Sequence, residues 1–183
     1  MSEKPSYLGL LNAVSNAESQ AECYLTAWAE VTPDDGVRHV ISTVALREGE
    51  HGKAFAKRLC ELGYTVLPRE DPKFDDKMAI ASSTTLTDRE KFEKLGFSRV
   101  VDPSAPDIFS KFFDDKTIDI QTGALLGRYI AEERDSDRML HGCYDQLCAA
   151  ENGHGSAGGA NGDLGAQLAR IEDLLEKLVA KKR

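Results

Sequence analysis

Apolar residues recur at steps of three and four between Val37 and Leu62, the spacing that places them on one face of an α-helix. Two ionisable residues, Glu48 and His51, occupy positions within this apolar face. A carboxylate buried without a partner costs several kcal/mol, so such a position normally occurs where a countercharge, commonly a metal ion, meets it. The pattern therefore predicts a helix that directs a carboxylate and an imidazole into a core.

Acidic residues interrupt the apolar face of two further predicted helices. In the helix predicted for about residues 7–31, Glu18 stands where the spacing requires an aliphatic residue. In the helix predicted for about residues 118–150, Glu133 and Asp137 do the same. Helical bundles build iron or manganese sites from carboxylates that several helices direct into one interior, with histidine as a further ligand. Together the three helices predict a carboxylate-rich site for iron or manganese.

The first two of these helices are predicted to pair as an antiparallel hairpin, because only a short connection separates them. Thr32 and Pro33 end the first helix, Asp34 or Asp35 is available to cap the second, and Gly63 ends it. The fold class predicted from the pattern is accordingly all-α.

The connection to the last long helix is predicted to be irregular. Residues 64–86 mix prolines, opposed charges and Ser/Thr runs, a composition typical of an ordered crossover. Thr87 and Glu90 form a Ser/Thr-x-x-Glu capping box, and Gly96 ends the short helix that this box begins. A Phe-rich stretch around residues 108–113 is predicted as another short packed helix.

The composition predicts that the chain has three segments. These are a helical domain over residues 1–150, a flexible Gly-rich linker over 151–162 and an amphipathic C-terminal helix over 163–183. The apolar residues of the last segment follow a heptad spacing for about two repeats. So few repeats fit a coiled coil, docking on a protein partner, or packing against the chain's own helices. We expect a homo-oligomer.

Charge and cysteine usage exclude several classes of function. The chain has 183 residues and a formal net charge of -8, which argues against a nucleic-acid partner. No apolar run is long enough to cross a membrane, and the first residues lack the apolar region of a signal peptide, so we expect a cytoplasmic protein. The four cysteines include no Cys-x-x-Cys pair, which excludes a zinc ribbon and a rubredoxin-type iron centre.

Two segments of the first two predicted helices carry recognisable motifs. Residues 17–21 read Ala-Glu-Ser-Gln-Ala and are followed by Tyr24, and residues 47–55 contain a Glu-x-x-His pair. These features resemble the Glu-Ser-Gln-Ala and Glu-x-x-His segments of the rubrerythrin-type members of the ferritin-like superfamily. The resemblance covers roughly residues 8–63, and it implies a ferritin-like antiparallel helical bundle with a diiron centre.

The resemblance also implies which residues bind the metal. It nominates Glu18, Glu48 and His51 as ligands, and a similarity of residues 129–133 to the third helix of the family nominates Glu133.

Two further carboxylates, Glu22 and Asp137, lie one helical turn from Glu18 and Glu133 and complete a candidate set of six ligands. The chain departs from the family in lacking a second Glu-x-x-His segment and a rubredoxin-like domain.

Two hypotheses for function result. In the first, the protein binds iron or manganese at this site and oxidises ferrous iron or reduces peroxide; the site then holds two metals or one. In the second, the site is a vestige whose carboxylates pair with Arg47, Arg128 or Arg134, and the protein is an assembly or adaptor protein that oligomerises or docks through its C-terminal helix.

Overall fold

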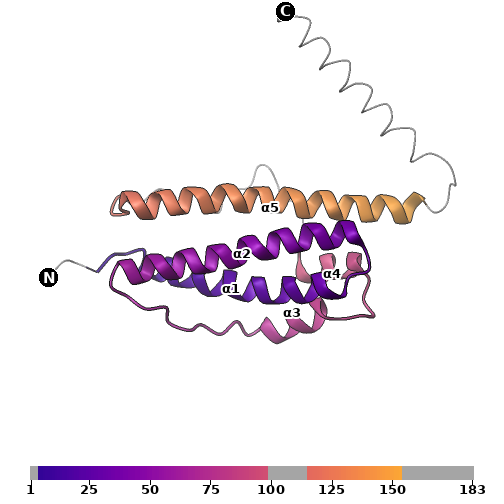
Figure 1. Ribbon diagram of the computed structural model, residues 1–183, viewed down its shortest axis with the longest axis horizontal. Helices are drawn as coiled ribbons and strands as arrows, with labels where there is room; N and C mark the ends of the chain where they lie inside the picture. Colours follow the sequence, from indigo (N-terminus) through magenta and orange to yellow (C-terminus); the bar gives the residue numbers. More distant parts are fainter. Residues whose placement is uncertain (1–3, 99–114, 154–183) are drawn as a thin grey trace, which may run out of the picture. The chain divides into compact units, whose positions relative to one another are not determined.

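The computed structural model describes residues 4–98 and 115–153, and these form five α-helices and no strand (Figure 1). The helices are α1 (Leu8–Val31), α2 (Asp35–Glu61), α3 (Phe74–Ala81), α4 (Asp88–Leu95) and α5 (Ile120–Gly153). The all-α prediction is therefore confirmed for the described part of the chain. The short helix predicted around 108–113, the linker beyond residue 153 and the C-terminal helix predicted over 163–183 lie outside the described residues.

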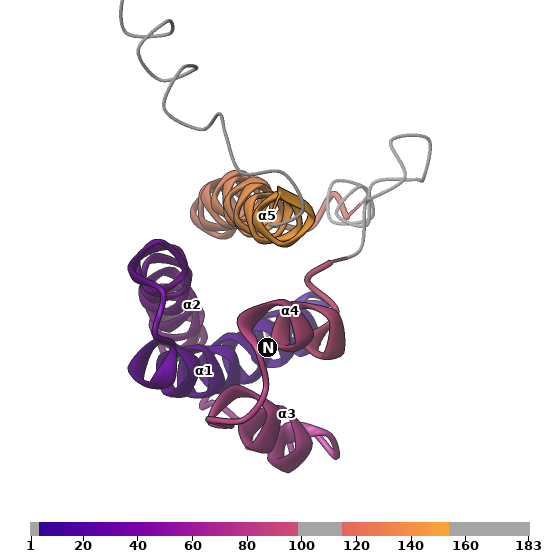
Figure 2. The same cartoon turned by 90° about the vertical axis from the view of Figure 1, so that its right-hand side faces the viewer.

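Helices α1 and α2 form the predicted antiparallel hairpin and pack along their length (Figures 1 and 2). The side chain of Asp34 caps α2 by accepting a hydrogen bond of 2.9 Å from the backbone N–H of Val37. After α2 the chain turns at Gly63, whose φ of 84° lies in the left-handed region that favours glycine.

A glycine sets how closely the two helices of the hairpin approach. A Cβ atom added at Gly52 would lie 3.1 Å from the backbone N of Ser19 and 3.3 Å from the backbone O of Ser15. The hydroxyl of Ser15 donates a 3.0 Å hydrogen bond to the carbonyl oxygen of Gly52. The backbones of α1 and α2 thus meet near the middle of the hairpin, one residue from His51.

The crossover after α2 contains one helix that was predicted and one that was not. Helix α4 begins with the predicted capping box, in which Thr87 and Glu90 exchange hydrogen bonds, and ends at Gly96, whose φ is 87°. Helix α3 packs against α1, and the ammonium of Lys77 lies 5.5 Å from the centre of the Tyr24 ring.

Two hydrophobic clusters occupy successive levels along the long helices. One cluster draws on the end of α1, the start of α2 and the middle of α5, and the other on the start of α1, the end of α2 and the first turns of α5. On each helix the candidate ligands lie between the residues that contribute to the two clusters. The first cluster is Leu25, Trp28, Ala29, Val37, Ile41, Val44, Ala45, Ala81, Phe92, Leu140 and Cys143; the second is Tyr7, Leu8, Leu11, Val14, Phe55, Leu59, Leu126, Tyr129 and Ile130.

The chain divides into two compact units, Met1–Leu147 and Cys148–Arg183. All candidate ligands belong to the first unit. Helix α5 continues to Gly153, three residues into the segment predicted as a linker. Among the helices that the structure describes, none combines the length and apolar character needed to cross a lipid bilayer.

Candidate metal centre

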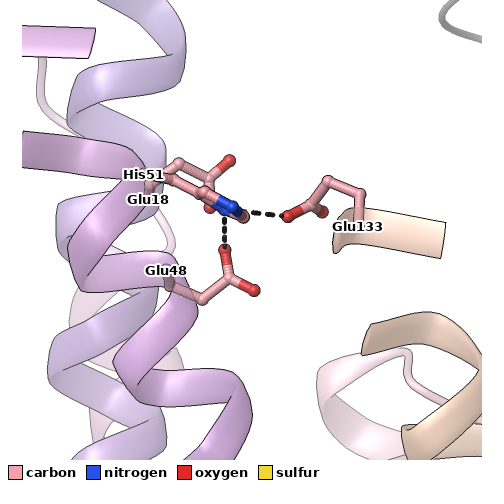
Figure 3. Close-up of side chains that lie close together, drawn as sticks. All are labelled: Glu18, Glu48, His51 and Glu133. Carbon is pink, nitrogen blue, oxygen red and sulfur yellow. Dashed lines mark ion pairs between the residues drawn. The ribbon is translucent and has the colours of Figure 1, made fainter. Parts of the chain in front are cut away.

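Four side chains from three helices converge on one point. They are Glu18 of α1, Glu48 and His51 of α2, and Glu133 of α5 (Figure 3). One donor atom from each lies within 4.8 Å of the donor atoms of the other three. Glu18 is 7%, Glu48 6% and His51 4% exposed, and Glu133 is half-buried. We refer to these four residues as the Glu/His cluster.

The two ring nitrogens of His51 face different carboxylates. Its Nδ1 atom points into the cluster, 3.3 Å from Oε1 of Glu133 and 3.9 Å from Oε2 of Glu48 (Figure 3). Its Nε2 atom lies 2.8 Å from Oε2 of Glu132, outside the cluster. Both Nδ1 of His51 and Oε1 of Glu133 are buried and have no hydrogen-bond partner among the described residues. A buried polar atom without a partner is costly, so this pair of atoms requires an explanation.

A tyrosine of α5 holds the side chain of Glu18 in place. The hydroxyl of Tyr129 donates a 2.7 Å hydrogen bond to Oε1 of Glu18. The Tyr129 ring also packs edge-on against His51, with 5.0 Å between the ring centres. One residue therefore contacts two members of the cluster from a third helix, which fixes their side chains at the boundary of the apolar core.

The charges in the cluster shift its pKa values strongly. Burial, together with the neighbouring carboxylate of Glu48, raises the pKa of Glu18 to about 9. Burial lowers the pKa of His51, but the neighbouring carboxylates of Glu133, Glu48 and Glu132 outweigh burial and raise the pKa to about 10. Burial also raises the pKa of Glu133, whereas His51 outweighs burial at Glu48 and lowers its pKa. At neutral pH the metal-free protein therefore holds a proton on Glu18, which is neutral, and on both nitrogens of His51, which is cationic.

The geometry and chemistry of the cluster fit a metal ion. Bonds of about 2.0–2.3 Å place donors on opposite sides of an ion roughly 4.0–4.6 Å apart, and the observed 4.8 Å limit is close to this span. Three carboxylates and an imidazole are suitable ligands for iron or manganese. An ion among them would also bind Nδ1 of His51 and Oε1 of Glu133, neither of which makes a hydrogen bond among the described residues.

A pocket gives access to the cluster. Its volume is about 520 Å³, and its lining includes Glu18, Glu48 and Glu133 together with apolar residues such as Leu25 and Leu140. A pocket of this size admits a small molecule as well as an ion. Three of the four residues of the Glu/His cluster are therefore reachable from one side.

Two of the six predicted ligands do not join the cluster. The carboxylate of Glu22 is 3.1 Å from the ammonium of Lys53. Asp137 is exposed, although it lines the pocket beside the cluster. The donor atoms of Glu22 and Asp137 are accordingly not among those that converge in the Glu/His cluster.

Two of the three arginines considered as partners of the site, Arg47 and Arg128, form ion pairs with carboxylates outside the Glu/His cluster. Arg47 pairs with Asp135 at 2.7 Å. Arg128 pairs with Glu132 at 2.9 Å and with Glu50 at 3.4 Å. Within the cluster, His51 forms ion pairs with the carboxylates of Glu133 and Glu48.

The sequence did not identify Glu132, because this residue lies beside the apolar face of its helix, where a carboxylate is normally solvated. Its position beside Glu133 was the available signal, since neighbouring residues of a helix that passes His51 are both able to reach the ring.

Comparison with known proteins gives no match to a family model, to a curated protein or to a solved structure. The described residues define an all-α protein with a buried Glu/His cluster that can hold a metal ion.

Proposed function

We propose that this protein is a ferritin-like metal-binding protein whose Glu/His cluster holds iron or manganese. Glu18, Glu48 and Glu133 supply carboxylate oxygens and His51 supplies Nδ1. A redox-active ion held there would support the oxidation of ferrous iron or the reduction of peroxide. The residues of the chain do the rest: they bind and orient the ion, keep one side open to the pocket and exclude water elsewhere by apolar packing.

One observation carries this proposal. Nδ1 of His51 and Oε1 of Glu133 face each other at 3.3 Å, both buried and both without a hydrogen bond among the described residues. Two further carboxylates surround the same point. A fold that needed only stability would gain by replacing such a group with apolar residues, because buried charges repay their desolvation poorly. A bound cation removes this cost.

Metal analysis of the full-length protein tests the proposal. After anaerobic loading with ferrous iron and removal of excess metal, we expect the wild type to retain at least one ion per chain. Glu48→Gln keeps the size of the side chain and removes its charge, so we expect this variant to lose the ion. Glu50→Gln is the matched control, because Glu50 lies two residues away on α2 with an exposed side chain.

The outcome also decides between the two hypotheses for function. A wild type that stays metal-free after loading with iron and with manganese contradicts the proposal and favours an assembly or adaptor role. If metal is retained equally by Glu48→Gln and Glu50→Gln, the ion binds elsewhere. Oxidation of added ferrous iron, or loss of added peroxide, is then measured on the metal-retaining protein, with Glu48→Gln as the inactive reference.

A further inference from the structure

Consecutive glutamates of α5 face the two ring nitrogens of His51. Oε1 of Glu133 lies 3.3 Å from Nδ1, and Oε2 of Glu132 lies 2.8 Å from Nε2. The second distance is that of a hydrogen bond with favourable geometry. The two ring nitrogens point in different directions, so a carboxylate bonded to Nε2 does not share an ion with Nδ1. Glu132 is accordingly absent from the group of converging donor atoms.

The carboxylate of Glu132 is itself held in place. Oε1 of Glu132 accepts a 2.9 Å hydrogen bond from Nε of Arg128, one helical turn earlier on α5. The guanidinium of Arg128 also reaches Glu50 of α2 at 3.4 Å. Glu132 therefore bridges Arg128 and His51, one with each oxygen, and its rotation is restricted at both ends.

We propose that Glu132 is a positioning residue of the metal centre, which fixes the proton of His51 on Nε2 and aims the lone pair of Nδ1 at the ion. A neutral imidazole carries one proton, and the nitrogen without it is the one that binds a metal. An ionised carboxylate has no proton to donate, so it pairs with Nε2 only when Nε2 carries the proton, and it thereby selects this tautomer. It also sets the plane of the ring, because a hydrogen bond at Nε2 opposes rotation about the Cβ–Cγ bond. This inference rests on the proposed function.

Binding of Mn²⁺ to the full-length protein, measured by titration calorimetry, tests the role of Glu132. We expect Glu132→Ala to bind the ion about 10–100-fold more weakly than the wild type, the usual effect of losing a carboxylate behind a histidine ligand. Glu132→Gln should fall between the two, because its amide oxygen still accepts a hydrogen bond from Nε2. The matched control is Glu50→Ala, which also removes a partner of Arg128 but leaves the hydrogen bond between Glu132 and His51 in place.

A spectroscopic measurement separates positioning from a structural role. The ring nitrogens of His51 in the Zn²⁺-loaded protein are assigned by ¹⁵N NMR. In the wild type we expect the proton on Nε2 and the metal on Nδ1. In Glu132→Ala we expect the Nε2–H proton to exchange faster with solvent and the ring signals to broaden, at an unchanged helix content by circular dichroism.

The outcomes distinguish this inference from the proposed function. If the wild type binds no metal, both are overturned. If the wild type binds Mn²⁺ and Glu48→Gln does not, but Glu132→Ala binds as tightly as Glu50→Ala, only the positioning role is overturned. Metal on Nε2 of His51 in the wild type overturns it as well. Should Glu132→Ala fail to fold, the affinity of Glu132→Gln and the tautomer of the wild type decide the question.

Discussion

At the scale of single residues, protons and a metal ion compete for the same atoms. Glu18 has a pKa of about 9 and His51 of about 10, so both are protonated at pH 7 in the metal-free protein. A metal needs the ionised carboxylate and the neutral imidazole, and its binding must release these protons. Affinity should therefore rise with pH, by up to about 100-fold per pH unit for two protons released.

Calorimetry provides the measurement for this prediction. Titrations of Mn²⁺ at pH 7 in buffers of different ionisation enthalpy give the number of protons released, and we expect about two. Glu50→Gln should release the same number, since Glu50 is exposed and outside the cluster. Release of no protons would contradict the assignment of Glu18 and His51 as ligands.

The residues of the cluster could largely be predicted, for a clear physical reason. Glu18, Glu48, His51 and Glu133 each interrupt an apolar helical face, and an ionisable group in such a position either finds a partner or destabilises the fold. Glu132 could not be predicted in the same way. It lies off the apolar face, and its role depends on the position of His51 on another helix.

At the scale of elements, the close contact between α1 and α2 depends on Gly52. An added methyl group there would press on the backbone of Ser19 and Ser15, which cannot move without shifting α1. We expect Gly52→Ala to lower the free energy of unfolding by about 1–3 kcal/mol, the usual cost of overpacking. It should also weaken metal binding, because α1 carries Glu18 past this contact.

A second glycine provides the control for this prediction. Gly127 of α5 is exposed, and a Cβ atom added there would meet nothing within 4 Å. Gly127→Ala should therefore raise the free energy of unfolding by up to about 1 kcal/mol, from helix propensity alone. Urea denaturation measures both variants. Equal effects of the same sign would show that the helix contact does not decide the outcome.

Helix boundaries could be predicted where local chemistry sets them, as at Asp34, Thr87 and Gly96. Helix α3 was missed because prolines and charges precede it and its single buried residue is Ala81. Its position comes from contacts that the local sequence does not show. Asn12 and Asn16 of α1 bind the backbone of Leu67 and Arg69, and so hold the preceding loop against α1.

At the scale of the whole molecule, the Glu/His cluster separates two apolar cores and is a source of instability until a cation is bound. The raised pKa of Glu18 indicates that the metal-free cluster destabilises the fold when Glu18 is ionised. In the unfolded chain its carboxyl ionises near pH 4.5, but the folded, metal-free protein keeps it protonated until about pH 9. Folding therefore becomes less favourable as the pH rises through this interval, since the unfolded state loses the proton first. The same holds for His51 between about pH 6.5 and 10, where its raised pKa makes the proton a source of stability that is lost with rising pH.

Glu18→Gln separates the stability of the fold from the function of the site. An amide needs no proton and still accepts the hydrogen bond from Tyr129, so at pH 8 the metal-free variant should be more stable than the metal-free wild type by on the order of 1 kcal/mol. With Mn²⁺ present, the wild type should be more stable than the variant. An ion at 100 times its dissociation constant adds about 2.7 kcal/mol to the free energy of unfolding of a protein that binds it only when folded, which raises Tm by roughly 5–10 °C. Thermal unfolding with and without Mn²⁺ provides the comparison, and the variant should show no such rise. A metal-free variant that is less stable than the wild type would mean that Glu18 stabilises the fold. That result would contradict its role as a metal ligand, because a ligand carboxylate is expected to destabilise the metal-free protein.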